Sequence, residues 1–489
     1  MLDIFSISSQ RATGDLPKLD VDDYRNVHLA ALRILGEAGV FVEDHKALAI
    51  FKSAGAVVDK NSQMVKLPSC MIEDAICSAP RRVRLAGRSD GFDVQLEKGR
   101  PIYVNAAGNV KIADLLTGAV RPSSKKDLID ATRLCDALNE VGVFSRAVYP
   151  LDQPFNALHL HTAEVCFNHT AKHCFHGPES KWQTEKIIEM ASAVMGGKEA
   201  LKARKPISFV CSVTSPLKLT RKFCEVCMAS ADAGFCTVIG SMVIGGGTGP
   251  VDLAGTLVQT NAEILAGIVL AQLIRKGVPV IYASFSTGMD LKVGTAPLGS
   301  PETAIIAAAV AALCQYYQIP CMVPGMSSDS KQPGSQAAFE KALTCLPAAR
   351  AEADLIIGMG GLESGLTFDL GQAALDAEFI RMVQHTNKKM DVNTETLSVD
   401  LIKKIGPIGN YLSHESTLRK MRSMSQVRLF DRFSREEWQN RHKPESYQKA
   451  LSWVQDILER HNPEPLPGLA AKKIRAIVEE AEKITTLKS

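Results

Sequence analysis

Short apolar segments alternate with longer helical patterns through the middle of the chain. Each apolar segment is followed by a small or polar loop and then by a pattern with helical periodicity, which predicts repeated βα units and a parallel sheet. An eighth strand near Leu366–Leu370 would complete a closed (β/α)8 TIM barrel, which we favour over an open doubly wound sheet. The other seven strand candidates are Val143–Tyr149, His173–His176, Ile207–Val213, Cys236–Ile244, Val280–Phe285, Cys321–Val323 and Leu355–Ile357.

The segments on either side of this α/β pattern differ from it. Residues 1–139 read as an N-terminal helical and β-hairpin region, residues 140–387 as the barrel and residues 388–489 as a C-terminal helical extension. Ser124 and Asp127 form a capping-box pattern at the start of a helix. The other predicted elements of the first region are helices over Asp22–Glu37 and His45–Ala54, and a hairpin that pairs Lys111–Leu115 with Ala119–Pro122.

Composition indicates an ordinary globular protein. The 489 residues are 46% hydrophobic and 22% charged, and a formal charge of +3 gives no electrostatic footprint for nucleic acid or an anionic membrane. The apolar runs Leu265–Ile274 and Ala304–Cys314 are too short to span a membrane and predict buried helices. Because the twelve cysteines are scattered and the amino terminus lacks a secretory pattern, we expect a cytoplasmic location.

The loops after the predicted strands are the candidate site, because barrel enzymes gather their chemistry at the carboxyl ends of the strands. The segment Pro320–Glu340 passes from an apolar strand through a polar loop into a helix, and Asp329 and Lys331 lie in that loop. Asp329 is equally explained as a cap of the following turn. The loops contribute Arg146, Tyr149, His176, Gly177, Thr214, Ser215, Gly245–Gly249, Ser284–Asp290, Ser327–Lys331 and Gly360–Phe368.

Three further patterns suggest chemistry that their context does not support. The glycine run after Ile244 lacks the Lys-Ser/Thr ending of a phosphate loop, so it better suits close approach of a large flat ligand or a partner to the backbone. Lys331 lies in a polar loop, where little desolvation would prepare it for Schiff-base chemistry. His159 and His161 point in different directions on a predicted helix, and Cys224 and Cys227 form a Cys-x-x-Cys in an apolar helical stretch without a second Cys or His pair nearby. We therefore expect no bound metal.

Three long segments resemble the trimethylamine methyltransferase family. They are GGGTGPVDLAGTLVQTNAEILAG from Gly245, SSDSKQPGSQAAFEKAL from Ser327 and GMGGLESGLTFDLGQAALDAEF from Gly358. Members of this family move a methyl group from a methylamine or quaternary amine to the cobalt of a separate corrinoid protein. The resemblance implies a (β/α)8 barrel, a corrinoid-protein partner and a substrate pocket inside the barrel mouth.

One departure from the family concerns the substrate. The trimethylamine enzymes carry pyrrolysine in the loop around Gly334–Gln336, and this chain has ordinary residues there. It therefore resembles the branch without pyrrolysine, whose members demethylate quaternary amines. Glycine betaine is the first expectation, with proline betaine, carnitine and γ-butyrobetaine as alternatives.

A quaternary ammonium already carries a neutral leaving group, so methyl transfer to Co(I) requires positioning and exclusion of water rather than a general acid. Aromatic faces attract such a cation, and Tyr103 and Phe368 are the preferred rings, with Tyr149 a further substrate-binding candidate. Asp329 and Glu363 are the catalytic candidates, because a carboxylate at some distance would attract the cation. The candidate donors for a betaine carboxylate are Arg146, His176, Lys331 and Asn105, and the candidate corrinoid-facing residues are Gly245, Gly246 and Gly247.

The corrinoid (cobalamin) is expected to come from the partner protein, because the chain has no Asp-x-His-x-x-Gly pattern that would supply a lower histidine ligand. We also expect a homo-oligomer. Three alternatives remain open: a zinc-dependent corrinoid methyltransferase for a methanol-like or methoxy substrate, a Schiff-base lyase that uses Lys331, and a betaine-binding sensor without catalysis.

Overall fold

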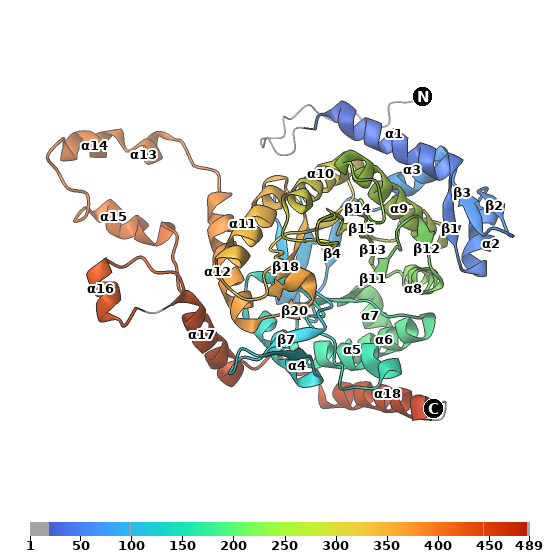
Figure 1. The fold of residues 1–489 in the computed structure, drawn as a ribbon. Coiled ribbons are helices and arrows are strands. Elements are labelled where there is room, and N and C mark those ends of the chain that lie inside the picture. The colour runs from blue at the N-terminus through green and yellow to red at the C-terminus, as the bar shows by residue number, and fades with distance from the viewer. Residues whose placement is uncertain (1–18, 98, 444, 487–489) are drawn as a thin grey trace.

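Eight parallel strands close into a barrel at the centre of the protein (Figure 1). The computed structural model describes residues 19–97, 99–443 and 445–486. Around the barrel the strands follow the order β6 (Ile102–Asn105), β9 (Val141–Ser145), β10 (His173–His176), β11 (Ile207–Ser212), β13 (Thr237–Ser241), β15 (Val280–Ser284), β17 (Cys321–Pro324) and β18 (Leu355–Met359).

Each barrel strand is followed by at least one helix on the outside of the barrel, which confirms the predicted (β/α)8 architecture. A short 3-10 turn, η2 (Phe155–Ala157), precedes the helix after β9. In strand order the helices are α4 (Lys125–Ala137), α5 (Leu158–His169), α6 (Lys181–Val194) with α7 (Lys198–Ala203), α8 (Arg221–Asp232), α9 (Leu253–Ile274), α10 (Pro301–Tyr317), α11 (Ser335–Arg350) and α12 (Leu370–Thr386).

The predicted eighth strand at Leu366–Leu370 is wrong. Glu363 and Ser364 both have positive φ and turn the chain back on itself within η3 (Glu363–Gly365), so the next strand cannot continue the barrel. It joins a separate sheet of β19 (Gly361–Leu362), β20 (Thr367–Phe368), β7 (Lys111–Ala113) and β8 (Val120–Pro122). The eighth barrel strand is β6, which lies inside the region 1–139, and the division into three domains stays a prediction.

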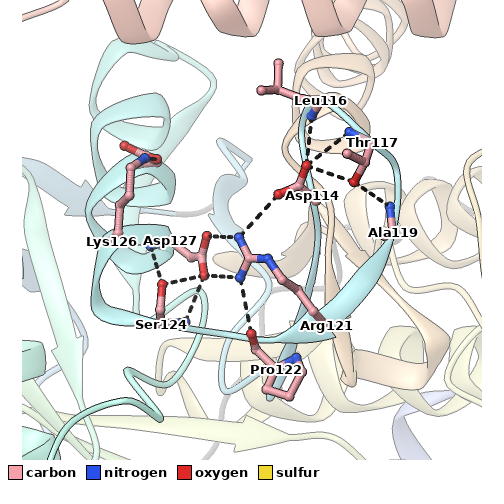
Figure 2. A network of polar contacts seen from close by, with 10 residues as sticks. Asp114, Leu116, Thr117, Ala119, Arg121, Pro122, Ser124, Lys126 and Asp127 are labelled. Carbon is pink, nitrogen blue, oxygen red and sulfur yellow. Dashed lines mark hydrogen bonds and ion pairs between the residues drawn. The ribbon is translucent and has the colours of Figure 1, made fainter.

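The hairpin predicted before the barrel is confirmed, with Lys111 opposite Pro122 and Ala113 opposite Val120. An ion-pair network holds it to the start of α4 (Figure 2). The Arg121 guanidinium donates to both carboxylate oxygens of Asp127, at 2.7 and 2.8 Å, and to Asp114 at 3.4 Å. Ser124 and Asp127 form the predicted capping box, so this network fixes the hairpin against the first turn of α4.

The first part of the described chain packs against the outside of the barrel and against the end at the amino termini of its strands. α1 and α3 lie on α9, and the β4–β5 hairpin joins the apolar side chains inside the barrel through Val83, Leu85 and Leu96. This hairpin fills the end opposite the βα loops, so the open mouth lies at the carboxyl ends of the strands. The elements are α1 (Val21–Glu37), β1 (Val40–Val42), α2 (His45–Ser53), β2 (Val57–Asp59), β3 (Met64–Lys66), α3 (Ser69–Ser78), β4 (Val83–Leu85), η1 (Asp90–Phe92) and β5 (Val94–Leu96).

Helix α9 is the only described helix that is long and apolar enough to cross a membrane, and 78% of its apolar window is buried inside the protein. It is longer than the apolar run suggested, and the prediction of a buried helix is confirmed. Three two-residue strands lie in the loops that follow barrel strands. β12 (Lys218–Leu219) pairs with β1, and β14 (Ile244–Gly245) pairs with β16 (Thr287–Gly288).

The last part of the chain packs against the barrel helices again, after the segment between α12 and α17. α17 packs on α12 and α4, and α18 packs on α5 and α6. Between α12 and α17, α13 to α15 form an arm that stands away from the barrel (Figure 1). The elements are α13 (Thr394–Leu397), α14 (Val399–Ile405), α15 (Glu415–Lys420), η4 (Met421–Ser423), α16 (Arg435–Asn440), α17 (Ser446–Arg460) and α18 (Gly468–Thr486).

Candidate active site

A cavity of about 200 Å³ opens at the carboxyl ends of β9, β10 and β11. It combines two positively charged side chains with aromatic and apolar ones, which is the mixture that a small charged organic ligand requires. Its lining comprises Ala107, Gly108, Ser145, Arg146, Tyr149, Phe175, Gly177, Pro178, Val210, Cys211, Ser212, Lys222, Phe223 and Val226. Of the residues predicted for the site, it brings together Arg146, Tyr149 and Gly177.

The half-buried Arg146 is the most unusual charge in this cavity. Its guanidinium lies 3.8 Å from the centre of the Tyr149 ring and 3.3 Å from Nδ1 of His159, and its Nε is buried without a hydrogen-bond partner among the described residues. Glu179 forms its ion pair with Lys222 instead and lies 3.9 Å from Nε2 of His159. Burial lowers the pKa of Arg146, which is the response of a cation that lacks a full countercharge.

His159 stays neutral beside this cation. Burial, together with the positive charges of Arg146 and Lys222, lowers the pKa of His159 to about 3. The uncharged ring can therefore accept a hydrogen bond from the guanidinium and hold it over the cavity without contributing a negative charge. The Arg146 guanidinium is left to attract an anionic ligand.

Asn105 connects two barrel strands and has no free donor for a ligand. Its amide nitrogen donates to the carbonyls of Ala106, at 2.8 Å, and Ser145, at 2.6 Å, while its oxygen accepts from the Ser145 N–H at 2.9 Å. Because both ends of the side chain are used, Asn105 fixes the register of β6 and β9 at the mouth.

Asp329 joins three βα loops. Its carboxylate accepts hydrogen bonds from the Leu298 N–H at 2.8 Å, the Gly299 N–H at 3.0 Å and the Ser364 hydroxyl at 2.6 Å. Glu340 on α11 in turn accepts from the backbone N–H of Asp329 at 2.8 Å. These partners lie in other loops and not in the turn that follows Asp329, so its side chain ties the loops after β15, β17 and β18 together instead of capping that turn.

Glu363 and Lys331 lie at the edge of the same loops. Glu363 accepts from the Thr367 hydroxyl at 2.7 Å and pairs with Lys111 of the hairpin at 3.3 Å. The hydrogen bond from Thr367 is the main reason why the pKa of Glu363 is lowered, so it is an anion at neutral pH. Lys331 is exposed and donates to the carbonyl of Asp329, in surroundings that offer no desolvation for Schiff-base chemistry.

The two rings preferred for the cation lie away from the cavity. Tyr103 is 2% exposed and packs in the layer between barrel and helices, with its hydroxyl beside Cys345 of α11. Phe368 is fully buried under Gly360, where an added Cβ would come within 2.7 Å of its ring. Neither ring presents an open face at the mouth, whereas Phe175 lines the cavity.

His176 also lies outside the cavity. Phe175 and Gly177 on either side of it line the mouth, and side chains alternate along a strand, so His176 points outward toward α5. Its ring is 2% exposed and lies 5.9 Å from that of Phe167. Burial and the nearby Arg146 lower the pKa of His176 to about 3, so its ring is neutral.

Gly245, Gly246 and Gly247 form part of the rim of the mouth. Gly246 has a φ of +86° and allows the tight turn that precedes α9. Large apolar side chains are exposed beside these glycines and in the facing loop after β15. They are Met242, Val251, Leu291 and Val293, with exposed fractions of 38%, 62%, 66% and 68%.

Two buried polar clusters near the mouth were not predicted. Lys341 on α11, 2% exposed, donates to the Met326 carbonyl at 2.6 Å and to Asp376 of α12 at 2.9 Å. Glu263 on α9, fully buried, accepts from the hydroxyls of Ser215 and Ser241. For Glu263, its place as the single charged residue of an otherwise apolar helix was the available signal, whereas Lys341 stands beside Glu340 in a mixed helix and gave none. Only the fold identifies the loops that they hold.

The sequence as a whole matches known proteins over almost its full length. Residues 7–484 match the family model described as trimethylamine methyltransferase (MTTB). The chain is 42% identical to trimethylamine methyltransferase MttB of Desulfitobacterium hafniense over 93% of this chain and 92% of that protein. It is 30% identical to a glycine betaine methyltransferase of the same species, over 96% and 98% of the two chains. The solved monomethylamine methyltransferase (MtmB) of Methanosarcina barkeri aligns over 90% of this chain and 94% of that one, with 14% identity and a TM-score of 0.49.

Proposed function

Because the chain belongs to the trimethylamine methyltransferase family, we propose that it transfers a methyl group from a quaternary amine with a carboxylate, glycine betaine first, to Co(I) of a partner's corrinoid. The observation that carries the substrate part of this proposal is Arg146, a half-buried cation that lines the mouth cavity and forms no ion pair with a carboxylate among the described residues.

The carboxylate separates a betaine from a methylamine. A methylamine is cationic at neutral pH and would be repelled by Arg146, whereas a betaine would place its carboxylate on the guanidinium as a charge-assisted pair. The relative with 42% identity is named for trimethylamine and the one with 30% identity for glycine betaine, so overall identity favours the former. The absence of pyrrolysine around Gly334–Gln336 and the unpaired Arg146 favour a betaine.

The residues of the mouth suit a reaction that depends on positioning. Arg146 would hold the carboxylate, and Phe175 and Tyr149 would exclude water from the ammonium end. The carboxylates of Asp329 and Glu363 already accept hydrogen bonds within the protein, so their role is to hold the loops and to add a distant negative potential. No proton has to be moved, because the amine leaves as a neutral group.

The corrinoid would be supplied by a separate protein and would accept the methyl group as Co(I). On this chain, the rim formed by Gly245–Gly247 and the exposed Met242, Val251, Leu291 and Val293 is the surface proposed to receive it. Glycines permit close approach of a flat macrocycle, and the exposed apolar side chains lose contact with water when it is covered.

The arm between α12 and α17 supports a homo-oligomer. It carries large apolar side chains that the described chain leaves in water, and a second copy would bury them. Among them, Met390 is 81% exposed, Val392 71%, Ile408 98% and Leu412 81%. A cytoplasmic location also remains part of the proposal.

The test is methylation of free Co(I) cobalamin by the purified protein with glycine betaine, proline betaine, carnitine, γ-butyrobetaine and trimethylamine, followed by absorbance. We expect methyl-Co(III) to form with at least one betaine and not with trimethylamine. Activity with trimethylamine alone would contradict the substrate assignment. Binding of a betaine without methylation, even with a corrinoid protein added, would identify a sensor instead.

A further inference from the structure

Three potential metal ligands meet between β10 and α5, on the outside of the barrel wall. The Sγ atoms of Cys166 and Cys174 and a ring nitrogen of His176 lie within 4.8 Å of one another, and all three residues are buried. Cys166 belongs to α5, while Cys174 and His176 lie two residues apart on β10 and therefore share its outer face. The sequence separated these residues into two elements, and only the fold brings them together.

His176 provides a second and independent sign of a ligand. Its Nε2 is buried and has no hydrogen-bond partner among the described residues, although the ring is 2% exposed. A buried nitrogen of this kind is normally paired, and coordination to a metal ion would satisfy its lone pair. The Cys174 thiol donates to the Lys172 carbonyl at 3.4 Å and has its other neighbour in Cys166.

The chain contains two other thiol pairs between a barrel strand and a helix, and they show what packing alone produces. Cys211 of β11 lies against Cys227 of α8, and Cys314 of α10 lies against Cys321 of β17. Buried cysteines behave as small apolar residues in such places. In the described residues, only the pair on α5 and β10 has a histidine as a third ligand.

We propose that Cys166, Cys174 and His176 bind one zinc ion that joins α5 to β10. Thiolate sulfur and imidazole nitrogen are the ligands that zinc prefers, and two thiolates with a neutral imidazole balance the charge of the dication. Neutrality favours this ion in a buried place. Binding releases two thiol protons to the solvent and changes no oxidation state. A fourth, small donor such as water would complete the tetrahedron.

The proposed ion would not activate the substrate. His176 points away from the cavity, whose lining includes its neighbours Phe175 and Gly177. The ion would instead bind to the outer face of β10, on the side of α5, and so hold the strand that forms the wall of the cavity in place. It is therefore distinct from the zinc of a zinc-dependent methyltransferase, and the proposal does not rest on the proposed function.

The experiment measures zinc in the full-length protein, purified with reductant and without chelator, then incubated with zinc chloride and desalted. We expect about one equivalent in the wild type, at least a tenfold loss in Cys174→Ser and His176→Gln, and full retention in Cys227→Ser, the matched change in a pair that lacks a histidine. A wild type without stoichiometric zinc, or equal zinc in Cys174→Ser and the wild type, would overturn the proposal.

X-ray absorption at the zinc edge keeps the test decisive if a variant fails to fold. The wild type should show two sulfur neighbours at about 2.3 Å and a nitrogen at about 2.0 Å. A shell of oxygen and nitrogen alone, or a Cys166–Cys174 disulfide found by mass spectrometry under reducing conditions, would count against the site. The methylation assay is a separate measurement, so failure of the zinc site leaves the proposed function untouched.

Discussion

Replacing Arg146 with Met tests the proposed recognition of a carboxylate. Methionine keeps an unbranched side chain that can still pack on Tyr149, but it removes the charge and every donor. Since Arg146 forms no carboxylate pair within the described protein, the change removes little that stabilises the fold, and we expect the free energy of unfolding to change by less than about 1 kcal/mol.

The expected effect on catalysis follows from the burial of the charge. Truncating one partner of a buried, hydrogen-bonded charge pair costs about 2–5 kcal/mol. Arg146 is half-buried and Lys222 lines the same cavity, so the lower part of that range applies. A loss of about 2–3 kcal/mol corresponds to a fall of about 30- to 150-fold in kcat/KM for glycine betaine.

The assay compares two substrates in steady-state transfer to Co(I) cobalamin. Glycine betaine should show the full loss, while tetramethylammonium, which has no carboxylate and is repelled by Arg146, should react at least as well with the variant as with the wild type. Arg33→Met is the control for loss of an arginine, because Arg33 is exposed on α1 and pairs only with Glu37 among the described residues. An equal loss for both substrates, or no loss for either, would refute the role of Arg146.

Three other variants test the supporting structure. Asp329→Asn should lower the free energy of unfolding by about 1–3 kcal/mol in a urea titration, because the new amide group faces backbone N–H donors. Unchanged stability would contradict this. The control Asp290→Asn, in an exposed loop, should have little effect. Lys341→Met should lower the free energy of unfolding by about 3–5 kcal/mol, because it leaves the Asp376 carboxylate buried and unpaired. The double variant Lys341→Met/Asp376→Leu should recover part of this loss. Losses that simply add in the double variant would argue against an ion pair. Burial alone would raise the pKa of Glu164, but hydrogen bonds from neighbouring side chains lower it to about 2. The difference in free energy of unfolding between the wild type and Glu164→Gln, at most about 3 kcal/mol, should therefore persist above pH 4.5 and vanish as the pH falls toward 2. A difference that does not depend on pH would contradict this.

The barrel was largely predictable because seven of its strands are apolar segments followed by long helices. The eighth was misplaced because β6 (Ile102–Asn105) is not followed directly by a helix: the hairpin separates it from α4. Leu366–Leu370 has the alternating apolar pattern of a strand and is followed directly by a helix. The positive φ angles of Glu363 and Ser364 direct it out of the barrel, and neither residue type indicates such a backbone conformation.

The site was predicted less well than the fold, for a physical reason. The strands of a parallel barrel are buried on both faces, so the sequence does not indicate which side chains point into the barrel. Phe175 lines the cavity while His176 faces α5, and Tyr103 faces α11 rather than the mouth. Arg146 and Tyr149 were easier to place because they follow a strand end, where a charged residue beside an aromatic one is unusual.

The most direct test of the central claim follows the methyl group itself. Glycine betaine with deuterated methyl groups is incubated with the protein and Co(I) cobalamin, and mass spectrometry quantifies both products. Transfer of one methyl group should give equal amounts of trideuteromethyl cobalamin and of dimethylglycine that retains two deuterated methyl groups. Unlabelled or absent methyl cobalamin, with the betaine recovered intact, would contradict it.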